Sequence, residues 1–401
     1  DNKNSKVENT KKYVSGSEIY RDRMRDLIRE VRSNTTKNKY LITQNGNLLY
    51  YRNNQIDKDF FNVTNGTTQE SLYYGEGLKL SHPTKKESNE FLLSILNPIR
   101  KAGKPIFAIN YGVGNKLRED LLVKSNQTNI INELLPSFGA EKAYMPIQNF
   151  NSNNINSLND VKNFLVLLNP KEFRDVDDFY NYLKNTDYDL LLIEPSHSGK
   201  YMTKEQIESL KRKKNGAKRI VIAYFSIGEA GGYRDFWKPE WKNKATRPSW
   251  IVGENPNWAD DYIVKYWSPE WRKIVKDYQK RLDDMGVDGY MLDTVDTYYN
   301  FEVKSEKSGE IIRKAVKAGA RYVFTSLNIS EEQVDKQSEL ENTIRLCTEH
   351  NLNLIVDINS TTKDIANLNS ENVYLRIDDG FTVDEILNLS EKNKIVLNAS
   401  T

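Results

Sequence analysis

The sequence contains few of the residues that build disulfide frameworks and metal sites. Cys347 is the only cysteine, which excludes an internal disulfide and a cysteine-rich metal site. The three histidines, His82, His197 and His350, lie far apart, so a zinc site built on histidine is not expected. We therefore expect the protein to use neither a metal ion nor an organic cofactor.

An excess of charge of one sign is also missing. The 401 residues include 58 basic and 56 acidic side chains, which gives a net charge of +2. No overall field therefore directs the chain to nucleic acid or to an anionic membrane. No apolar run approaches the roughly 20 residues that a membrane span needs. Residues 1–17 are polar and lack a signal-peptide pattern, and we expect a flexible segment there.

Short apolar runs that alternate with amphipathic stretches make up most of the chain. The spacing of apolar residues predicts a helix over 19–31. Further helices are expected over 87–101 and 115–137, and strands over 39–46, 63–74, 104–112 and 141–147. The polar stretch NFNSNNINSLND at 148–159 then indicates a loop.

Four more predicted strands follow this loop, in the runs VKNFLVLLNP, YDLLLIEPS, KRIVIAYFSIGEA and VDGYMLDTVD. Thr203 and Gln206 have the spacing of a capping box, which predicts that a helix begins there. Ser268 and Pro269 predict the start of another helix, and Gly286 predicts its end. Eight strands that alternate with helices favour a (β/α)8 barrel of the TIM type, an α/β fold whose active site lies at the carboxyl ends of its strands.

The remaining residues, 304–401, repeat this pattern on a smaller scale. Helices are predicted over 308–318 and near 331–350, and strands in the runs RYVFTSLN, LNLIVDIN, VYLRIDDGF and KIVLNAST. Four strands with open edges form half a barrel, which is seldom stable alone. We expect a partial α/β segment there.

The stretch VDGYMLDTVDTY at 287–298 carries the clearest chemical signal. Its apolar strand, Tyr290 to Leu292, runs directly into Asp293. A carboxylate in such a position is costly unless it is paired, hydrogen-bonded or used in chemistry. The spacing alone favours a catalytic and a structural carboxylate about equally.

Several stretches resemble glycoside hydrolase family 114, the endo-α-1,4-polygalactosaminidase family of (β/α)8 barrels. The matching runs are IAYFSIGEAGGYRDFW (222–237), WIVGENPNWADDYIVKYWSPEW (250–271) and GVDGYMLDTVDTY (286–298), with YLITQNG, ESLYY and GKPIFAINYG earlier in the chain. The resemblance implies an endo-acting bacterial glycoside hydrolase. Its expected substrate is a polysaccharide of α-1,4-linked galactosamine and N-acetylgalactosamine, and its expected location is extracellular or at the cell surface.

The order of the matching parts is unusual. In the family, the part that resembles 160–303 precedes the part that resembles 18–150. We therefore interpret 18–303 as one circularly permuted barrel with halves 18–150 and 160–303. The alternative is that 1–150 ends one barrel and that a second barrel begins at 160. Residues 317–401, with the runs KAGARYVFTSLNIS, LNLIVDIN, LRIDDGFTVDEI and IVLNAST, resemble the start of the 6-phospho-N-acetylmuramidase barrel family, and this partial likeness implies no activity.

The resemblance places the two catalytic carboxylates of the family at Asp293, in LDTVD, and at Glu70, in QESLYY. Glycoside hydrolysis needs one carboxylate that attacks or stabilises the oxocarbenium centre and one carboxylic acid that protonates the leaving oxygen. We assign Asp293 as the nucleophile and Glu70 as the acid/base, which predicts retention of anomeric configuration. Without the resemblance, Glu70 looks like any polar residue at a strand edge.

Ten further residues are candidate substrate contacts because they end or follow predicted strands or belong to an aromatic-rich segment. They are Gln44, Asn45, Asn110, Glu194, Tyr224, Ser226, Glu229, Trp267, Asp296 and Tyr298. The family usually has Asp in place of Glu194, and often in place of Asn110. The second difference removes a charge, which bears on the preference for cationic galactosamine.

Two other functions fit parts of the sequence. One is a carbohydrate-binding surface barrel without turnover, although both candidate catalytic carboxylates are present. The other is a barrel that acts on a phosphosugar, as the likeness of 317–401 suggests. Such a barrel needs a phosphate site of backbone amides and basic residues after its late strands.

Overall fold

The structure, a computed structural model, describes residues 18–326, 340, 343–358, 371–377, 381–391 and 393–397. The segment predicted to be flexible, 1–17, and part of the helix predicted near 331–350 lie outside these residues. The chain divides into two compact units, one containing Glu18–Arg247 and Ile251–Tyr298, the other containing Pro248–Trp250 and Tyr299–Thr401. Each unit has its own sheet.

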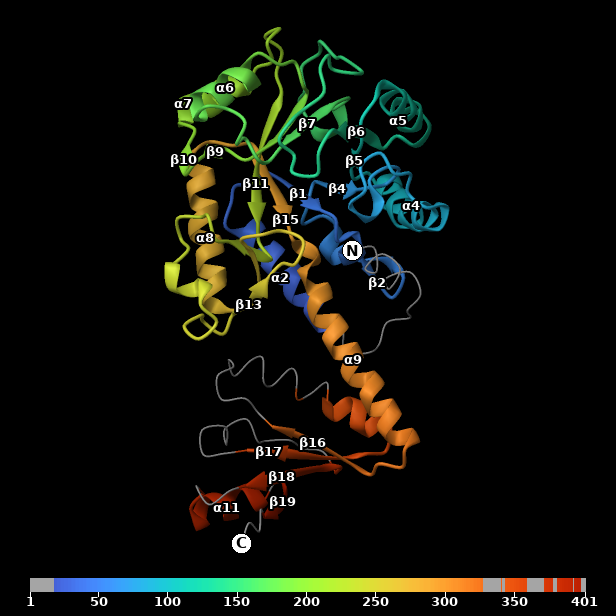
Figure 1. Ribbon diagram of the computed structural model, residues 1–401, viewed down its shortest axis with the longest axis vertical. Helices are drawn as coiled ribbons and strands as arrows, with labels where there is room; N and C mark the ends of the chain where they lie inside the picture. The colour runs from blue at the N-terminus through green and yellow to red at the C-terminus, as the bar shows by residue number, and fades with distance from the viewer. Residues whose placement is uncertain are drawn as a thin grey trace. The chain divides into compact units, whose positions relative to one another are not determined.

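The first unit contains a sheet of eight strands in the order β6-β5-β4-β1-β15-β11-β8-β7, and every neighbouring pair is parallel (Figure 1). The strands are β1 (Tyr40–Gln44), β4 (Gly66–Glu70), β5 (Ile106–Tyr111), β6 (Ile131–Leu135), β7 (Phe164–Leu167), β8 (Leu190–Ile193), β11 (Ile220–Ser226) and β15 (Gly289–Asp293). The sheet curls into a nearly closed barrel, which confirms the predicted TIM-type fold. At the two ends of the strand order, the Glu133 carboxylate on β6 accepts a hydrogen bond from the backbone N–H of Phe164 on β7.

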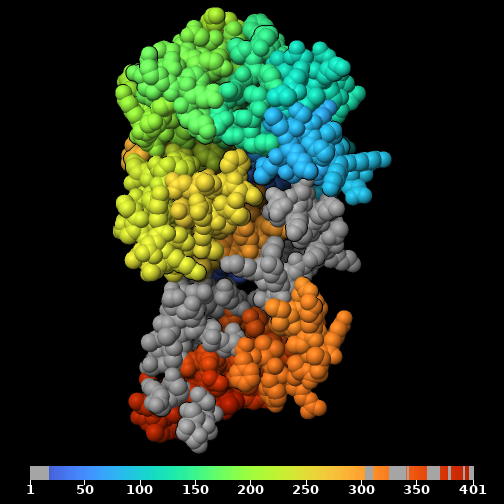
Figure 2. Space-filling model, in the orientation of Figure 1, coloured from blue at the N-terminus to red at the C-terminus, as the bar shows by residue number. Residues whose placement is uncertain are grey.

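Strands from both sides of the 148–159 loop belong to this one sheet. The first barrel strand in the sequence, β1, pairs directly with the last barrel strand, β15. The interpretation as two separate barrels is therefore wrong. Figure 2 shows the blue, green and yellow parts of the first unit as one continuous body. Within this chain the eight strands follow one another around the barrel in sequence order. The circular permutation relative to the family that the sequence resembles stays a prediction.

The helices of the first unit fill the connections between strands. They are α2 (Glu18–Ser33), α3 (Lys58–Phe61), α4 (Lys86–Lys101), α5 (Asn115–Thr128), α6 (Val176–Lys184), α7 (Lys204–Leu210) and α8 (Pro269–Asp284). Small antiparallel pairs are formed by β2 (Tyr51–Arg52) with β3 (Gln55–Ile56) and by β9 (Ser196–His197) with β10 (Lys200–Tyr201). The capping box predicted before α7 is present, since the backbone N–H of Gln206 donates to Thr203 Oγ1 at 3.1 Å and the backbone N–H of Thr203 donates to Gln206 Oε1 at 3.0 Å.

One part of the predicted pattern is wrong. The helix expected over 115–137 ends at Thr128, and the strand expected over 141–147 is absent, because the fourth barrel strand is β6. Asn129 adopts a left-handed backbone conformation with φ 57° and ends α5, as Asn does at many helix ends. The strand then begins at Ile131, while Pro146 in the segment first taken for a strand has no N–H for a ladder.

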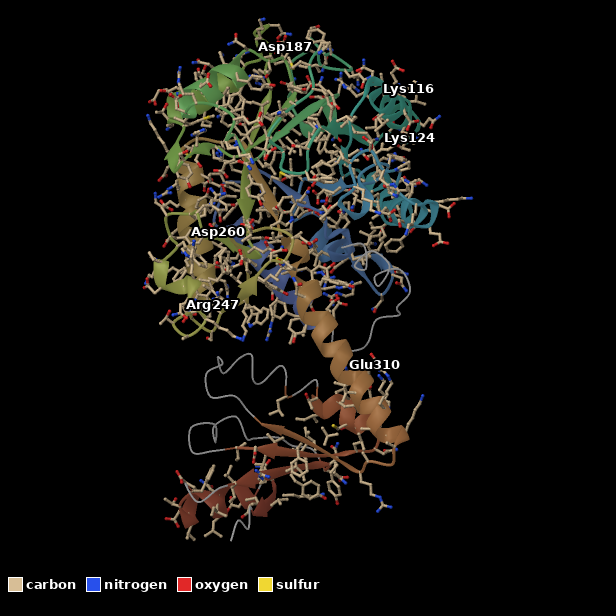
Figure 3. The ribbon with its side chains drawn as sticks, viewed as in Figure 1. Lys116, Lys124, Asp187, Arg247, Asp260 and Glu310 are labelled. Carbon is tan, nitrogen blue, oxygen red and sulfur yellow. The ribbon has the colours of Figure 1, made fainter. Side chains whose placement is uncertain are left out.

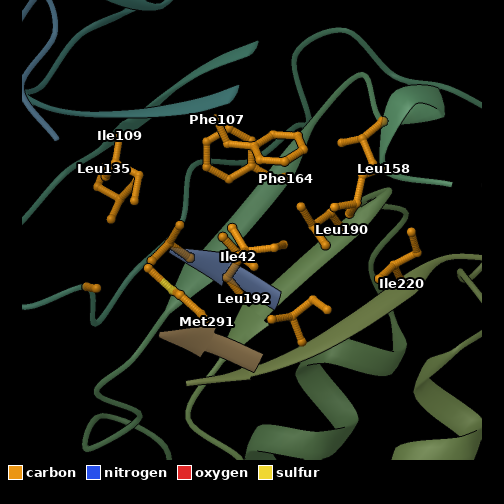
Figure 4. Packing of buried hydrophobic residues seen from close by; sticks show 14 of the residues in the cluster. Ile42, Phe107, Ile109, Leu135, Leu158, Phe164, Leu190, Leu192, Ile220 and Met291 are labelled. Carbon is orange, nitrogen blue, oxygen red and sulfur yellow. The ribbon is translucent and has the colours of Figure 1, made fainter. Parts of the chain in front are cut away.

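The barrel interior is filled by apolar side chains from both halves of the unit. Ile42, Phe107 and Ile109 from the first half pack with Leu192 and Met291 from the second (Figure 4). Along each strand the inward-facing residues alternate, as the pleat of a strand requires. The interior is thus a packed core, and the polar groups of a site must lie above it, at the strand ends.

Gly289, the first residue of β15, shows how closely the central strands approach. A Cβ atom built on Gly289 would lie 2.0 Å from the carbonyl oxygen of Tyr40 on β1. Real Cβ atoms do not make such contacts, so only glycine fits at this position. The close contact fixes the register in which Asp293 ends the strand.

Charged side chains of both signs cover the outer helices of the first unit. Lys124 on α5, labelled in Figure 3, forms an ion pair with Asp120 one turn away, at 2.7 Å. Asp120 also accepts a hydrogen bond from the hydroxyl of Tyr74 at 2.6 Å. Such exposed pairs contribute little stability and keep the surface polar.

The second unit contains a four-stranded parallel sheet in the order β16-β17-β18-β19. Its elements are α9 (Tyr298–Lys317), β16 (Tyr322–Ser326), β17 (Asn353–Asp357), β18 (Val373–Ile377), α11 (Val383–Ser390) and β19 (Lys394–Leu397). Buried residues such as Leu354, Val356 and Leu375 form its core with Cys347. The predicted partial α/β segment is present. Among the described residues of the whole chain, no helix is both long and apolar enough to cross a membrane.

Candidate active site

Polar residues end five neighbouring strands of the barrel. Gln44 ends β1, Glu70 ends β4, Tyr111 ends β5, Ser226 ends β11 and Asp293 ends β15. Because all eight strands are parallel, these residues meet at one end of the barrel. Residues two positions apart on a strand share a face, so a polar side chain at a strand end continues the inward-facing row of core residues below it.

Asp293 is held by two hydrogen-bond donors. The Tyr224 hydroxyl donates to its Oδ2 at 2.6 Å, and the backbone N–H of Thr294 donates to its Oδ1 at 2.7 Å. The pKa of Asp293 is raised to about 6, mainly by burial and also by the charge of Glu70, while the hydrogen bonds from Tyr224 and Thr294 act in the opposite direction. Asp293 is therefore ionised at neutral pH but gains a proton in mildly acidic solution.

Glu70 is held in a similar way on the other side of β1. The Asn45 side-chain amide donates to its Oε2 at 2.6 Å, and the Asn45 side-chain carbonyl accepts from the backbone N–H of Glu70 at 2.9 Å. The Tyr111 hydroxyl donates to Oε1 of the same carboxylate. Two neighbouring strands therefore supply the groups that orient Glu70.

The charges of Asp293 and Glu70 affect the same neighbouring groups. The charge of Glu70 contributes to the raised pKa of Asp293. Burial, followed by the charges of Glu70 and Asp293, raises the pKa of Tyr111 well above its ordinary value, so the phenol stays protonated and can donate. Both carboxylates are thus close enough to influence one hydroxyl group.

The residue after three of these strand ends has a left-handed backbone conformation. Asn45 follows Gln44 with φ 57°, Ser71 follows Glu70 with φ 52°, and Thr294 follows Asp293 with φ 60°. Asn adopts this conformation readily, but for a β-branched Thr it is strained. The sharp turn at Thr294 is what lets its backbone N–H reach the Asp293 carboxylate. Its hydroxyl also accepts from the backbone N–H of Gly228 at 2.7 Å.

A small antiparallel sheet in the connection between β11 and β15 adds more carboxylates. Its strands are β12 (Glu229–Gly231), β13 (Ile251–Glu254) and β14 (Asp261–Val264), in the order β12-β14-β13. Burial raises the pKa of Asp261 to about 7 and that of Glu229 to about 8, and the charge of Asp293 raises both. This sheet therefore places two carboxyl groups near Asp293 that are partly or mostly protonated at neutral pH and can donate a hydrogen bond to a ligand.

Glu229 gives a test of this electrostatic arrangement. Between its ordinary pKa of 4.5 and about 8, folded Glu229 keeps a proton that the unfolded chain has released. Stability therefore falls as pH rises through this window. We expect Glu229→Gln to match the wild-type melting temperature at pH 5 and to exceed it by several degrees at pH 9. The exposed Glu240→Gln is the control, and parallel pH profiles for all three proteins would contradict the burial of an ionisable group at 229.

The other predicted contacts on the rim take part in local networks. The Ser226 hydroxyl contacts Thr294 Oγ1 at 2.9 Å and donates to the backbone carbonyl of Glu229 at 3.1 Å. Gln44 is buried, and its side-chain carbonyl accepts from the Thr68 hydroxyl. Asp296 is exposed just after β15, and its charge raises the pKa of Glu229. These residues adjoin the two candidate carboxylates.

The side chains of Glu194 and Asn110 already make hydrogen bonds within the protein. Both oxygens of Glu194 accept from Arg234, at 2.9 and 2.6 Å, in a nearly buried bidentate pair. Asn110 is fully buried and uses its carbonyl for the backbone N–H groups of Tyr73 and Tyr74. The structure thus gives both residues a role in holding the strand ends, while contact with a substrate stays a prediction.

The two aromatic candidates are engaged with the helix before β1. Tyr298 is fully buried, and the Arg21 guanidinium lies over its ring, 4.9 Å from the centroid. Trp267 packs against Tyr20, and the Arg23 guanidinium lies 4.4 Å from the centroid of its ring. Trp258 is different, since 42% of its surface is exposed, which makes it a better candidate for stacking on a sugar.

Sequence reasoning missed Tyr111, Asp261 and Arg234. A signal for Tyr111 was available, because Phe107 and Ile109 precede it at alternate positions on an apolar strand. The other two lie in irregular connections whose path the sequence pattern does not predict. Among the residues that the structure describes, no group of three or more His, Cys, Asp or Glu is arranged to hold a metal ion.

Two family models match overlapping parts of the chain, both after residue 171. Residues 172–334 match the model of glycoside-hydrolase family GH114, and residues 297–401 match the model of the N-terminal part of 6-phospho-N-acetylmuramidase. The first range contains Asp293 and the small antiparallel sheet. Glu70 lies outside both ranges, so its place opposite Asp293 rests on the barrel alone.

The curated relatives are themselves uncharacterised. A protein of Methanocaldococcus jannaschii is 37% identical over 152 residues, which are 37% of this chain and 41% of that protein. A protein of Thermotoga maritima is 32% identical over 134 residues, 31% of this chain and 41% of that protein. The chain thus spans less than half the length of these relatives.

Two solved structures show weak overall similarity. The Aspergillus fumigatus Ega3 complex with galactosamine is 16% identical, with a TM-score of 0.22, and the match covers 53% of this chain and 84% of that one. The GH20 β-N-acetylhexosaminidase of Streptomyces coelicolor A3(2) is 9% identical, with a TM-score of 0.19, and the match covers 57% of this chain and 46% of that one.

Proposed function

We propose that the first unit is a glycoside hydrolase that uses Asp293 and Glu70. One observation carries this proposal: the two carboxylates end strands of the same barrel, each is oriented by a tyrosine hydroxyl, and the charge of one raises the pKa of the other. Two coupled carboxyl groups in one cleft are what glycoside hydrolysis requires. The GH114 match over 172–334 supports the same reaction class.

In the proposed mechanism the ionised Asp293 attacks the anomeric carbon while Glu70 gives its proton to the leaving oxygen. Tyr224 and the Thr294 N–H hold Asp293 in place, since both donate to its carboxylate. Asn45 and Tyr111 orient Glu70. Glu70 then takes a proton from a water molecule that attacks the anomeric carbon, the bond between this carbon and Asp293 breaks, and the sugar leaves with its original anomeric configuration.

The proposed substrate is a polymer of α-1,4-linked galactosamine, in part N-acetylated. Asp293, which is ionised at neutral pH, and Asp261, which is partly ionised there, support this choice, because they form an acidic environment that suits an ammonium group on the sugar. Glu229, whose pKa is raised to about 8, adds negative charge only at higher pH. A polymer of this size does not cross a membrane, so we also propose that the enzyme meets it outside the cell or at the cell surface. Detection of the protein only in the cytosolic fraction would contradict that location.

The test of the reaction is incubation of the full chain with α-1,4-linked galactosamine polymers of different acetylation, followed by mass spectrometry. Shorter oligosaccharides should appear with the wild-type protein and be absent with Asp293→Asn. Release of fragments from the partly deacetylated polymer, and little from the fully acetylated one, would support the role of the acidic environment. Polymer that stays intact under all conditions would contradict the proposal.

Tyr224→Phe should change the pH profile of this activity. Tyr224 stabilises the ionised form of Asp293, so its loss raises the pKa of Asp293 above about 6. A hydrogen bond to a charged group contributes about 1.5–3 kcal/mol, which equals roughly 1–2 pKa units. The acidic limb of the kcat/KM profile should therefore move to higher pH by that amount. Tyr40→Phe, at the opposite end of the barrel, is the control, and an unmoved limb in Tyr224→Phe would show that Asp293 does not limit activity at low pH.

A further inference from the structure

A cavity lies at the end of the barrel opposite the two candidate carboxylates, Asp293 and Glu70. Its volume is about 340 Å³. Its lining includes Gly103, Lys104 and Pro105, which come just before β5, and Asn129, just before β6. Glu70 and Asp293 lie at the other ends of the strands, so the cavity is separate from the proposed active site.

The lining of this cavity is polar and basic. It contains three basic residues, one serine and several asparagines, but no aspartate or glutamate. The polar members are Arg100, Lys104, Lys162, Ser125, Asn126, Asn129, Asn149 and Asn159. A lining without acids is notable in a chain whose net charge is only +2.

Arg100 is the central feature of the lining. Its Nε atom is buried and has no hydrogen-bond partner. The structure gives its guanidinium no ion pair with any residue that it describes. Because Nε itself is buried, a ligand with acceptor oxygens would bind the terminal nitrogens of the guanidinium, for which the structure shows no hydrogen bond to any residue that it describes. The guanidinium fork suits a phosphate or carboxylate in particular.

The other charged residues near the cavity do not neutralise the guanidinium of Arg100. The amino group of Lys104 is already bound to the carbonyl oxygens of Phe61 and Thr64, both at 2.6 Å, and burial lowers its pKa to about 7, so at neutral pH it adds only part of a charge and no free donor. Lys162 is exposed, and its backbone N–H donates to Asp189. That aspartate is neutralised by Lys213 at 2.5 Å. The positive potential of the cavity is therefore available to a ligand.

We propose that this cavity binds a small oxyanion, held by Arg100 and Lys162 with the asparagine amides as further donors. The volume accommodates a phosphate or carboxylate group together with the small molecule that carries it. This site is independent of the proposed hydrolase activity, since none of its residues touches Asp293 or Glu70 in the described contacts.

The test is isothermal titration calorimetry of the full chain with inorganic phosphate, and separately with acetate, at constant ionic strength. Constant ionic strength is needed because salt screens exposed charges. Wild type should bind at least one of the two anions, and the stronger one identifies the chemical class. Arg100→Gln should weaken binding by at least about tenfold, the effect of losing a hydrogen bond to a charged group.

Lys101→Gln is the matched control. Arg100 and Lys101 both lie in the last turn of α4, so both substitutions remove the same charge from the same helix end. Lys101 does not line the cavity, and its variant should bind as wild type does. Lys162→Gln, at an exposed position, should repeat the loss without a folding defect. Equal weakening by Arg100→Gln and Lys101→Gln, or no binding of either anion by wild type, would overturn the proposal.

Discussion

Asp293→Asn is expected to abolish hydrolysis of both polymer and activated aryl glycosides. An amide cannot attack the anomeric carbon or stabilise positive charge there, so kcat should fall by roughly 10⁴-fold or more, as when other nucleophiles are removed. The amide can still occupy the same space beside Tyr224 and Thr294. Substrate binding should therefore survive, and kinetic assays together with binding titrations would separate the two effects.

Two controls make this result specific. Asp277→Asn, on the exposed surface of α8, removes the same charge where Asp277 only pairs with Lys273, and it should leave activity unchanged. NMR of the first product should show the original anomeric configuration. An inverted product, or an Asp293→Asn variant with turnover near that of wild type, would mean that Asp293 is not the nucleophile.

Glu70→Gln is expected to slow the enzyme in a manner that depends on the leaving group. Polysaccharide hydrolysis needs a proton on the leaving oxygen, so kcat should fall by about 10²–10⁴-fold, the usual contribution of general acid catalysis. An aryl glycoside with a good leaving group needs no such proton, so its first step should be nearly unaffected.

The design of this experiment rests on the contacts of Glu70. A glutamine at position 70 has the same shape and can accept from either Asn45 or Tyr111 through its one carbonyl oxygen, while its amide group takes the place of the other oxygen. Glu90→Gln, on the exposed side of α4, is the matched control. Equal losses on both substrates would show that Glu70 binds the sugar and does not act as an acid.

Much of the fold could be predicted because local signals agree with the final structure. The capping box at Thr203 begins α7 as expected, and the alternation of apolar residues marks most of the strands. The errors arose where local signals compete. The segment before β6 has helix-forming residues up to Thr128, and only the left-handed Asn129 stops the helix.

The candidate site was predictable in part for the same reason. Asp293 and Glu70 end strands, and strand ends of a parallel barrel meet. The partners of other residues depend on how distant connections fold back, which no periodicity shows. Glu194 is an example, since its carboxylate is paired with Arg234, 40 positions further along the chain. Trp267 is another, because its ring lies against Tyr20, in the helix that precedes the barrel.

The pairing of β1 with β15 has a consequence for the order of events during synthesis. The chain emerges from the ribosome N-terminus first, so β1, β4, β5 and β6 can assemble long before β15 exists. Until then β1 and β11 each have an open edge, because β15 pairs with both of them. The nascent chain must keep these two edges from pairing elsewhere. Since Asp293 is the last residue of the last barrel strand, a polypeptide released early has part of the sheet but lacks the proposed nucleophile.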